Sequence, residues 1–348
     1  MKAIVIGDAL VSSSVLEEAC FQMNFEYPIT EVDKFEWYSN LSKDEFQEHI
    51  LEIERFGPEK VTLPENLLDS LLDADYIFCH YAPISKEMIL AAPNLKMVGT
   101  CRGGLENVNL EALKENNVNM IHVIRNAEPV ADFALGLMFS ETRNISRAHL
   151  AISKGTWQKS FSNDEYKTIL RNQTVGIAGA GYIGKQLIKR LNGLGIKTYV
   201  YDPFVKEEAL EKDGLDVTML DTLEELFKTV DILSLHMRVT EETKEIVDEK
   251  LLNLMKPSAY IINTARADLI KKEDLIEALK IKKIAGAALD VSWTEPIELT
   301  DDLLSLDNIT LTTHIAGDTV DAIPLSPLLL KDVINEYLEK GFSDMVVI

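Results

Sequence analysis

The stretch Thr174–Leu187 reads TVGIAGAGYIGKQL and decides the fold of the second half of the chain. Its glycines Gly179, Gly181 and Gly184 have the spacing Gly-x-Gly-x-x-Gly, directly after an apolar strand and at the start of an expected helix. The first glycine permits a tight turn, the second lets a pyrophosphate approach the free N–H groups of the helix N-terminus, and the third permits close packing of helix on strand. The stretch therefore predicts a dinucleotide-binding turn.

A carboxylate at the end of the next expected strand extends this motif. Asp202 follows the strand at 197–201 and lies 18 residues after Gly184. There it can accept hydrogen bonds from the adenosine ribose and would repel a 2′-phosphate, so NAD is favoured over NADP. A structural turn with a surface Asp is the alternative, but it does not explain the context and the spacing together. Tyr182 and Ile183 begin the helix and complete the predicted cofactor loop.

Short apolar runs separated by helical segments lie on both sides of the motif. Strands are expected at residues 3–6, 76–79, 97–100, 120–123, 175–178, 197–201, 232–235, 260–263, 286–290 and 309–312. This alternation is typical of an α/β fold with parallel sheets. The 348 residues suffice for two domains, at roughly 100–200 residues each. We therefore expect two Rossmann-like or flavodoxin-like domains.

The segment at 27–65 shows the weakest pattern in the chain. It is expected to be irregular around a single helix, Lys43–Phe56. Ser42 is expected to cap this helix, with Asp44 and Glu45 favourable in its first turn because they complement the helix dipole.

Two further helical patterns have structural consequences. Residues 128–154 show helical spacing throughout and are expected to form one long helix that Asn126 caps. In the polar loop that follows, Trp157 predicts an aromatic anchor at a dimer or domain contact. The helix at 324–340 has no place in the second sheet and is expected to return to the first domain.

Composition limits the classes of function. The chain has 35 Lys and Arg against 57 Asp and Glu, a net charge of −22, so nucleic acid is not an expected partner. No apolar stretch approaches the length of a membrane helix, so no membrane partner is expected. Cys20, Cys79 and Cys101 have no zinc or redox spacing and are too few for a disulfide framework. We expect a cytoplasmic protein without a metal site.

Three polar residues that follow strands of the second half suit one chemistry. Arg266 follows the strand at 260–263, Glu295 follows 286–290, and His314 follows 309–312. Ligands of an open parallel sheet bind at the carboxyl ends of strands, so all three are expected beside the nucleotide.

The residue types of this triplet match hydride transfer to a 2-keto acid. A guanidinium can bind a carboxylate in a fork and polarise a ketone, an imidazole can exchange a hydroxyl proton, and a carboxylate can orient the imidazole. Each residue alone has an ordinary surface explanation, and their joint placement is what favours the catalytic one.

Other strand ends add candidates. His236 and Thr264 are expected to line the cofactor crevice because they follow strands of the nucleotide-binding half. His80 ends the strand at 76–79 and is a candidate to face a substrate.

Several runs together resemble the D-isomer-specific 2-hydroxyacid dehydrogenase family. They are VGIAGAGYIG with Asp202-Pro203, DILSLHMRVTEETKEIV, MKPSAYIINTARADLI, AGAALDVSWTEP, TTHIAG, and upstream AAPNLKMVGTCRGGLENVNLEAL and RNAEPVADFALGLM. They cover most of residues 70–320. The resemblance implies an NAD-dependent enzyme that acts on a small D-2-hydroxy acid or 2-keto acid, and a homodimer.

The resemblance also implies residue roles at the cofactor. Arg266 would bind the substrate carboxylate and carbonyl, His314 would be the acid–base group, and Glu295 would be its partner. Asp290 would hold the nicotinamide carboxamide, and Gly317 would belong to the same cofactor site.

On the substrate side, the resemblance implies a loop of backbone N–H groups at Arg102-Gly103 that binds the carboxylate, with His80 nearby. It further implies a discontinuous substrate domain, residues 1–125 with 318–348, and an NAD-binding domain at 126–317.

The sequence also departs from the family pattern. Arg102 enters a loop that is usually small and apolar, which indicates either an additional anionic or polyhydroxylated substrate group, as in a sugar-derived acid, or a side chain that faces solvent. Cys79-His80 replaces the Arg-Ser pair of phosphoglycerate dehydrogenases, which counts against that substrate. Arg238 stands where the family usually has proline. The roles of Arg238 and Tyr81 stay open.

Two other functions compete with this interpretation. A non-catalytic NAD(H)-sensing protein can keep the same fold and the same triplet. A formate dehydrogenase would have Gln in place of Glu295, so this residue disfavours it.

Overall fold

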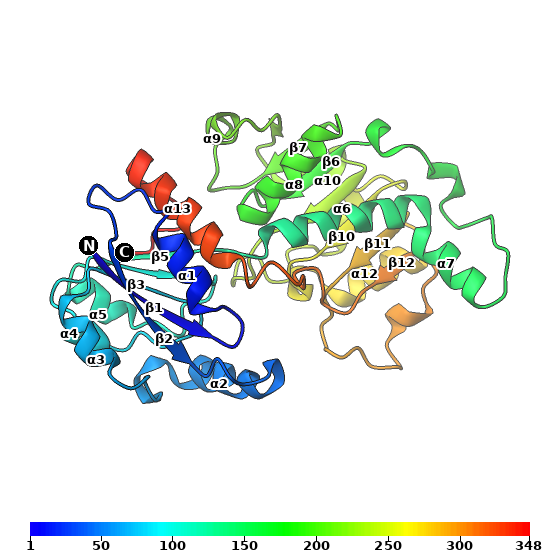
Figure 1. Ribbon diagram of the computed structural model, residues 1–348. Coiled ribbons are helices and arrows are strands. Elements are labelled where there is room, and N and C mark those ends of the chain that lie inside the picture. Colours follow the sequence, from blue (N-terminus) through cyan, green and yellow to red (C-terminus); the bar gives the residue numbers. More distant parts are fainter. The chain divides into compact units, whose positions relative to one another are not determined.

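The computed structural model describes residues 1–348 except for the side chains of Asp44 and Glu54. The expected role of Asp44 therefore lies outside the described residues. The chain divides into two compact units (Figure 1). Met1–Arg125 and Thr319–Ile348 form the first, here called the terminal unit, and Asn126–Asp318 form the second, the central unit.

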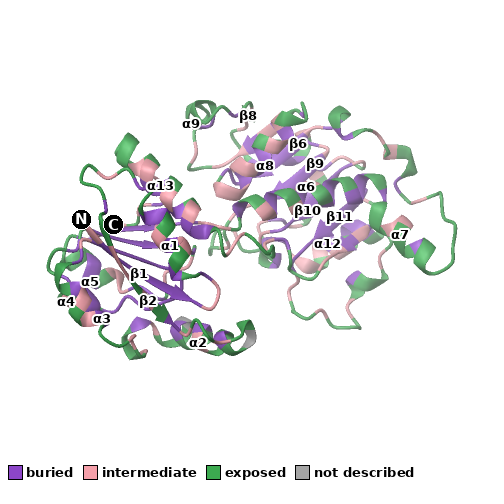
Figure 2. Cartoon of the chain, viewed as in Figure 1, coloured by how far each residue is buried: buried purple, intermediate pink, exposed green. Residues whose placement is uncertain are grey.

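The terminal unit contains a five-stranded parallel sheet in the order β2-β1-β3-β4-β5. The strands are β1 (Lys2–Asp8), β2 (Glu31–Trp37), β3 (Tyr76–Cys79), β4 (Met97–Thr100) and β5 (Asn119–His122). The inner strands read as continuous apolar runs because helices cover both faces of a parallel sheet. In Figure 2 these strands are buried, whereas the outward faces of the helices are exposed.

The helices of the terminal unit come from both ends of the chain. They are α1 (Ser13–Cys20), α2 (Lys43–Phe56), α3 (Leu67–Ser70), α4 (Lys86–Ala91), α5 (Leu110–Glu115) and α13 (Ser326–Lys340), with short 3₁₀ turns η1 (Pro58–Lys60) and η2 (Leu71–Asp73). The expected α2 is capped by Ser42, whose side chain accepts from the N–H of Glu45 in a capping box. The last helix packs against α1 and β5, which makes this unit discontinuous in sequence.

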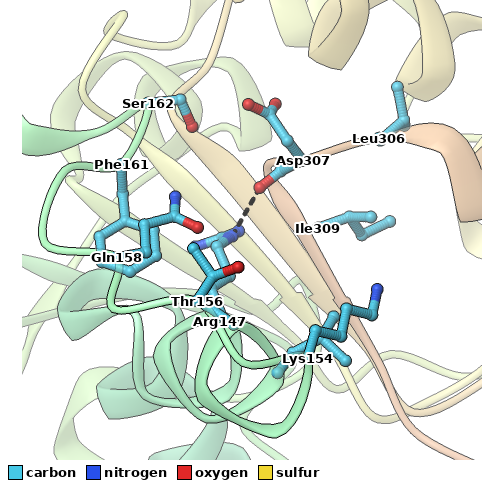
Figure 3. A pocket seen from close by; sticks show the side chains of 11 residues that line it. Arg147, Lys154, Thr156, Gln158, Phe161, Ser162, Leu306, Asp307 and Ile309 are labelled. Atoms are coloured by element: carbon cyan, nitrogen blue, oxygen red, sulfur yellow. Dashed lines mark hydrogen bonds between the residues drawn. The ribbon is translucent and has the colours of Figure 1, made fainter.

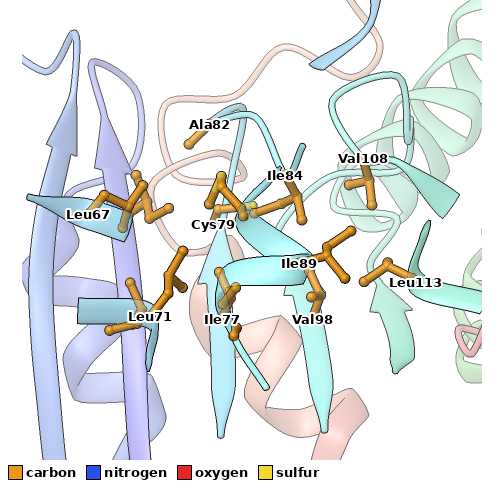
Figure 4. Close-up of a cluster of buried hydrophobic side chains, with 14 of the residues drawn as sticks. Leu67, Leu71, Ile77, Cys79, Ala82, Ile84, Ile89, Val98, Val108 and Leu113 are labelled. Atoms are coloured by element: carbon orange, nitrogen blue, oxygen red, sulfur yellow. The ribbon is translucent and has the colours of Figure 1, made fainter. Parts of the chain in front are cut away.

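Apolar side chains from β3 and β4 meet those of the short helices in one core (Figure 4). Ile77 and Val98 on the strands are fully buried, as are Leu71 and Leu113 on the neighbouring turns and helices. This packing fixes the carboxyl ends of β3 and β4, and with them the loops that follow.

The segment expected to be irregular contains a strand, and that expectation is wrong. β2 pairs in parallel with β1 along its whole length. It lies at the edge of the sheet, where Glu31, Lys34 and Glu36 are exposed between half-buried residues. Charged residues on an edge strand discourage pairing with other chains, and they also hide the strand from a search for apolar runs.

The central unit contains a seven-stranded parallel sheet in the order β12-β11-β10-β9-β6-β7-β8. The strands are β6 (Val175–Ala178), β7 (Thr198–Tyr201), β8 (Thr218–Met219), β9 (Ile232–Leu235), β10 (Tyr260–Asn263), β11 (Gly286–Leu289) and β12 (Ile309–Leu311). The predicted α/β class with two parallel sheets is confirmed. The edge strand β8 was not expected, because two residues carry no periodicity.

Seven helices surround this sheet among the described residues. They are α6 (Ala127–Arg143), α7 (Ile145–Ser153), α8 (Tyr182–Gly193), α9 (Glu207–Lys212), α10 (Leu223–Thr229), α11 (Glu249–Leu254) and α12 (Lys272–Lys280), with 3₁₀ turns η3 (Asp164–Tyr166), η4 (Leu170–Asn172), η5 (Ala267–Leu269) and η6 (Asp302–Ser305). Within the described part of the chain, no helix is both long and apolar enough to cross a membrane.

The single long helix expected at 128–154 is wrong, because Asn144 separates α6 from α7. Asn144 has a φ of +58°, in the left-handed region. Its side chain donates to Oδ1 of Asn163 at 2.7 Å, a partner far along the sequence that helical spacing cannot reveal. Asn126 precedes α6 as expected, but its side chain makes no capping hydrogen bond.

Candidate active site

The carboxyl ends of six adjacent strands of the central unit carry a continuous row of predicted site residues. In sheet order, these strand ends present Asp202 after β7, Gly179 after β6, His236 after β9, Thr264 and Arg266 after β10, Asp290 after β11, and His314 after β12. Strand order reverses beside β6, which has β7 on one side and β9 on the other. Such a switch point is where open parallel sheets bind their ligands.

The glycine loop has the geometry that close approach of a phosphate requires. Gly179 has a φ of +98°, and a Cβ there would lie 2.9 Å from the backbone carbonyl of His236. A Cβ on Gly184 would lie 2.2 Å from the carbonyl oxygen of Gly179. A Cβ on Gly181 would meet nothing within 4 Å, so space is open beside it. The loop is therefore closed on its inner side and open at Gly181.

The N-terminus of α8 can receive an anion at this opening. Gly181 is the cap residue and offers no side chain to the first N–H groups, and the first turn has no acidic residue. Tyr182 and Ile183 form that turn and are half-buried. Free N–H groups and the positive end of the helix dipole favour a phosphate there.

Asp202, at the carboxyl end of β7, holds the glycine loop through hydrogen bonds. Its Oδ2 accepts from the N–H of Ala180 at 2.8 Å, and its Oδ1 accepts from those of Phe204 at 2.8 Å and Val205 at 3.1 Å. Oδ2 has a further lone pair with which to accept a ribose hydroxyl. The sequence motif predicted the position of Asp202 but not this bond to the loop.

Two buried polar atoms of the row lack a partner in the described residues. They are Nδ1 of His236 and Oγ1 of Thr264, which follow the adjacent strands β9 and β10. His236 Nε2 pairs with the hydroxyl of Ser234 at 2.8 Å, and burial lowers the pKa of His236 to about 4, so the ring is neutral. Buried polar atoms without partners are rare because they cost free energy, so these two fit a site that a polar ligand completes.

His314 and Glu295 form a close pair. Nδ1 of His314 lies 2.8 Å from Oε2 of Glu295, and Oε1 of Glu295 accepts from the N–H of Ser292 at 2.9 Å. The Ser292 N–H and then His314 lower the pKa of Glu295, and the charge of Arg266 adds to the effect. An ionised Glu295 holds Nδ1–H and leaves Nε2 of His314 free to exchange a proton.

Arg266 is exposed beside this pair. Its backbone carbonyl accepts from the side chain of Asn263, the last residue of β10, and its Nη1 donates to the carbonyl of Ala265 at 2.7 Å. This leaves the remaining guanidinium donors available, in the fork arrangement that suits a carboxylate. The structure thus brings Arg266, Glu295 and His314 to one edge of one unit.

Asp290 and Gly317 lie next to the loop that carries His314. The Asp290 carboxylate is buried and accepts from Oγ1 of Thr312 and from the N–H groups of Ile315 and Ala316. Gly317 packs closely on Asn126 at the start of α6. The expected contacts of both residues with a cofactor stay predictions.

His80, Arg102 and Gly103, the expected substrate residues, belong to the terminal unit and not to the central one. His80 is fully buried, and its Nδ1 lies 3.0 Å from Oδ2 of Asp8 at the end of β1. Its Nε2 has no partner among the described residues. Sequence reasoning missed Asp8, although its place at the end of the first strand was a signal.

The Asp8 carboxylate organises the loops at this second sheet edge. It accepts from the N–H groups of Leu10 at 2.9 Å, Val11 at 3.0 Å and Tyr81 at 2.9 Å. Burial alone would raise the pKa of Asp8, but His80 and the backbone N–H groups outweigh it and hold that pKa below its usual range.

Arg102 is buried, so the alternative that it faces solvent is wrong. Its guanidinium lies 4.0 Å from the ring centre of Tyr81. Nη1 donates to Asn107 at 3.2 Å and lies 3.1 Å from Oε2 of Glu106. The carbonyl of Gly103 lies 3.1 Å from Nδ1 of His122. These contacts hold the Arg102-Gly103 loop in place.

The described residues contain no group of three or more His, Cys, Asp or Glu that could hold a metal ion. The three cysteines are buried and free.

A family model described as D-isomer specific 2-hydroxyacid dehydrogenase, NAD binding domain, matches residues 135–316. The chain belongs to this family. NAD is therefore the cofactor of the central unit, and the glycine loop, the uncapped start of α8 and the two unpartnered polar atoms fit it.

Relatives in the 2-hydroxyacid dehydrogenase family match most of the chain. This chain is 36% identical over 266 residues to a glyoxylate reductase of Thermofilum pendens, and the match covers 74% of this chain and 76% of that enzyme. It is 33% identical over 286 residues to a D-3-phosphoglycerate dehydrogenase of Methanocaldococcus jannaschii, covering 81% of this chain and 53% of that enzyme. The chain thus spans about half the length of the second relative.

A solved structure shows the same fold over the whole chain. It is the NAD-complexed D-isomer specific 2-hydroxyacid dehydrogenase from Lactobacillus delbrueckii ssp. bulgaricus, with a TM-score of 0.69, 20% identity and full coverage of both chains. At this identity the likeness concerns the fold.

Proposed function

We propose that this chain is an NAD-dependent dehydrogenase or reductase that interconverts a small D-2-hydroxy acid and the corresponding 2-keto acid. The observation that carries the proposal is the pair of His314 Nδ1 and Glu295 Oε2 at 2.8 Å, with Arg266 on the same sheet edge as the glycine loop. Such a pair has the parts needed to exchange the proton of the hydroxyl oxygen on the carbon where the redox change occurs.

Each residue of the triplet has a definite task in this proposal. When bound, NADH supplies the hydride. Arg266 binds the carboxylate of the keto acid and polarises its ketone, because its free donors form a fork. His314 gives the proton from Nε2 to the developing alkoxide in reduction and takes it back in oxidation. Glu295 fixes the ring through Nδ1 and stabilises the imidazolium.

The substrate side is assigned to the terminal unit. The resemblance supports backbone N–H groups at Arg102-Gly103 as the carboxylate site, with the loop held by the buried Arg102. His80 is assigned a neighbouring position, and Asp8 fixes its ring. The relatives named a glyoxylate reductase and a D-3-phosphoglycerate dehydrogenase support a small 2-keto acid. A sugar-derived acid is a candidate, while Cys79-His80 counts against phosphoglycerate.

The assembly proposed for this enzyme is a homodimer. Ile145 and Ile152 on α7 are more than half exposed, and Trp157 in the next loop is 77% exposed. A cavity of about 300 Å³ lies beside them, between α7, this loop and the edge strand β12 (Figure 3). Trp157→Asp should halve the mass measured by light scattering, whereas Phe204→Asp, a change at another exposed aromatic residue, should leave it unchanged.

We place this enzyme in the cytoplasm. The three cysteines are free and buried, as in a reducing compartment, and burial raises the pKa of the Cys79 thiol to about 12. Localisation of a tagged full chain by fractionation tests this assignment.

The experiment that tests the activity follows the absorbance of NADH with a panel of 2-keto acids. The panel contains glyoxylate, pyruvate, hydroxypyruvate, branched and aromatic keto acids, and keto sugar acids with and without phosphate. We expect turnover with at least one acid, lost in His314→Asn and kept in His149→Asn, a matched change on α7. Tight NADH binding without turnover of any acid would instead support a non-catalytic NAD(H) sensor.

A further inference from the structure

The sheet of the terminal unit has a switch point of its own. In the order β2-β1-β3-β4-β5, β2 lies on one side of β1 and β3 on the other, so the strand order reverses beside β1. Open parallel sheets with this order bind ligands outside the carboxyl ends of the strands at the reversal. Asp8 ends β1 and His80 directly follows β3, so these two residues lie at the switch point.

His80 is held in one orientation there. Its carbonyl accepts from Oγ1 of Thr100 at 3.0 Å and from Nδ2 of Asn107 at 3.2 Å. Its ring meets the ring of Tyr81 edge-on, with 4.7 Å between the ring centres. Nδ1 lies 3.0 Å from Oδ2 of Asp8, whose carboxylate is itself held by backbone N–H groups. These contacts fix both the position and the plane of the imidazole.

The pair with Asp8 decides which hydrogen-bonding group the ring presents. Burial lowers the pKa of His80 and outweighs the charge of Asp8, which raises it, while the charges of Arg125 and Arg102 lower it further. The ring is therefore neutral beside an ionised Asp8. A neutral ring that donates Nδ1–H to a carboxylate carries a lone pair on Nε2. Nε2 is thus an acceptor, fully buried and without a partner among the described residues.

The charges around Nε2 limit the group that can donate to it. The ionised Asp8 beside the ring, and Glu106 beside Arg102, disfavour a second anionic group such as a phosphate. The guanidinium charges that lower the pKa of His80 disfavour an ammonium group. A methyl group would leave the buried acceptor unpaired, which costs free energy. A neutral hydroxyl group satisfies all three conditions.

We propose that Nε2 of His80 accepts a hydrogen bond from a hydroxyl group on the side chain of the substrate, so that the enzyme prefers a hydroxylated 2-keto acid to its deoxy analogue. The assignment rests on the proposed function, which gives the substrate side to the terminal unit. His80 is then a specificity-determining residue, and Asp8 is a positioning residue that fixes its Nδ1–H. Of the two substrate types that Arg102 suggests in the sequence, this assignment favours the polyhydroxylated acid over the anionic one.

Two matched pairs of keto acids test this selection. Hydroxypyruvate and pyruvate differ by a hydroxyl group on C3, and 4-hydroxy-2-ketobutyrate and 2-ketobutyrate differ by one on C4. In wild type, kcat/KM should favour the hydroxylated member of at least one pair by about tenfold or more, because the deoxy acid leaves a buried acceptor unpaired. In His80→Leu, which removes the acceptor, this ratio should fall below about threefold.

Two further variants separate selection from packing. Ile77 is fully buried on β3, the strand that ends before His80. Ile77→Ala should lower Tm, as His80→Leu does, but should keep the wild-type ratio within each pair. His80→Gln retains an acceptor oxygen on a polar side chain and should keep part of the ratio. Equal ratios in wild type and His80→Leu would show that His80 serves the fold alone.

The ¹⁵N signals of the imidazole measure the hydrogen bond in the wild-type enzyme itself. With NADH bound, D-glycerate and D-lactate cannot be oxidised, and they differ by the C3 hydroxyl group. D-2,4-dihydroxybutyrate and D-2-hydroxybutyrate form the corresponding pair for C4. We expect His80 to be the neutral Nδ1–H form, and its Nε2 signal to move upfield with the hydroxylated member of the preferred pair and not with the deoxy member.

The outcomes distinguish this assignment from the proposed function. A protonated Nε2, or an Nε2 signal that responds to neither hydroxylated acid, would overturn the role of His80. Equal kcat/KM for both members of both pairs would do the same, while turnover itself would leave the proposed function standing. If wild type neither turns over a keto acid nor binds a hydroxy acid, the proposed function and the role of His80 both fail.

Discussion

The carboxyl ends of the two parallel sheets differ in how their polar groups are satisfied. In the terminal unit, Asp8 accepts from three backbone N–H groups and from His80, and Arg102 contacts Tyr81 and Asn107. In the central unit, the His236 and Thr264 side chains each leave a buried atom without a partner in the described residues.

The proposed catalytic triplet of the central unit also has polar groups that remain open, because Arg266, Glu295 and His314 are exposed. A sheet edge whose polar groups bond to each other holds loops in shape. An edge with open donors and acceptors is prepared to receive a ligand. His80 Nε2 is the exception at the terminal edge, as a buried atom without a described partner.

Arg266→Ala should remove chemistry and leave the fold. We expect kcat/KM for the keto acid to fall by roughly 10³-fold or more, because the substrate carboxylate loses its charged fork. NADH affinity, measured by fluorescence, should change by less than about threefold. Arg171→Ala, at an exposed residue of the same unit, is the control and should keep full turnover. Lost NADH binding in Arg266→Ala would mean that the residue supports the cofactor instead.

Asp8→Asn, at the sheet edge of the terminal unit, should have the opposite effect and lower the stability of the fold. The carboxylate is buried with four donors around it, so the free energy of unfolding should fall by about 3 kcal/mol. Denaturant unfolding of the full chain measures this loss. Asp33→Asn, on the half-exposed strand β2, should cost less than about 1 kcal/mol. Equal losses in both variants would remove the distinction that we draw between the two edges.

Asp202→Ala should lower both stability and cofactor selectivity, because this residue holds the glycine loop and is proposed to bind the ribose. We expect the preference for NAD over NADP to fall about tenfold or more, since a charged acceptor is lost. Kd values for the two reduced cofactors measure it, and Asp221→Ala, at an exposed position, is the control. An unchanged preference with lowered Tm would show that Asp202 acts on the protein alone.

Glu141 lies away from both sheet edges, and its effect on the pH dependence of stability can be compared with theirs. It is buried beside Arg147 and Thr310, and burial outweighs these partners and raises its pKa to about 7. The folded state then holds the proton more tightly than the unfolded chain, whose Glu has a pKa of about 4.5. The stability from this group is fully present below that value and is lost as pH rises through 7.

Comparison with Glu141→Gln isolates the effect of this one group. The free energy of unfolding of wild type, relative to the variant, should fall by about 1 kcal/mol between pH 6 and pH 8. Denaturant titration at the two pH values measures it. A difference that is independent of pH would show that Arg147 keeps Glu141 ionised throughout this range.

The sequence predicted those features that depend on neighbouring residues. The inner strands are apolar runs bounded by glycine or polar residues, and the glycine loop has a fixed spacing. The capping box of α2 also depends on local contacts alone, between Ser42 and Glu45. The strand ends that carry Arg266, Glu295 and His314 followed from the same strand pattern.

The features that the sequence did not predict depend on distant contacts. Asp8 and His80 are 72 positions apart, and nothing in either neighbourhood indicates the other. Asp202 and Asp290 were placed at strand ends, but their bonds to loops 22 and 26 positions away require the folded sheet. β2 and the break at Asn144 were missed for the same reason, since an edge strand and a left-handed Asn depend on their partners.

We propose that NADH held at the sheet edge of the central unit transfers hydride to the carbon next to a carboxylate. The most direct measurement uses NADH deuterated at the transferable position of the nicotinamide ring, with the keto acid that gives the fastest turnover. We predict that wild type places the deuterium on C2 of the hydroxy acid with D configuration, and that Arg266→Ala and His314→Asn do not. NADH oxidation without deuterium on C2, or deuterium transfer that survives both substitutions, would contradict the account.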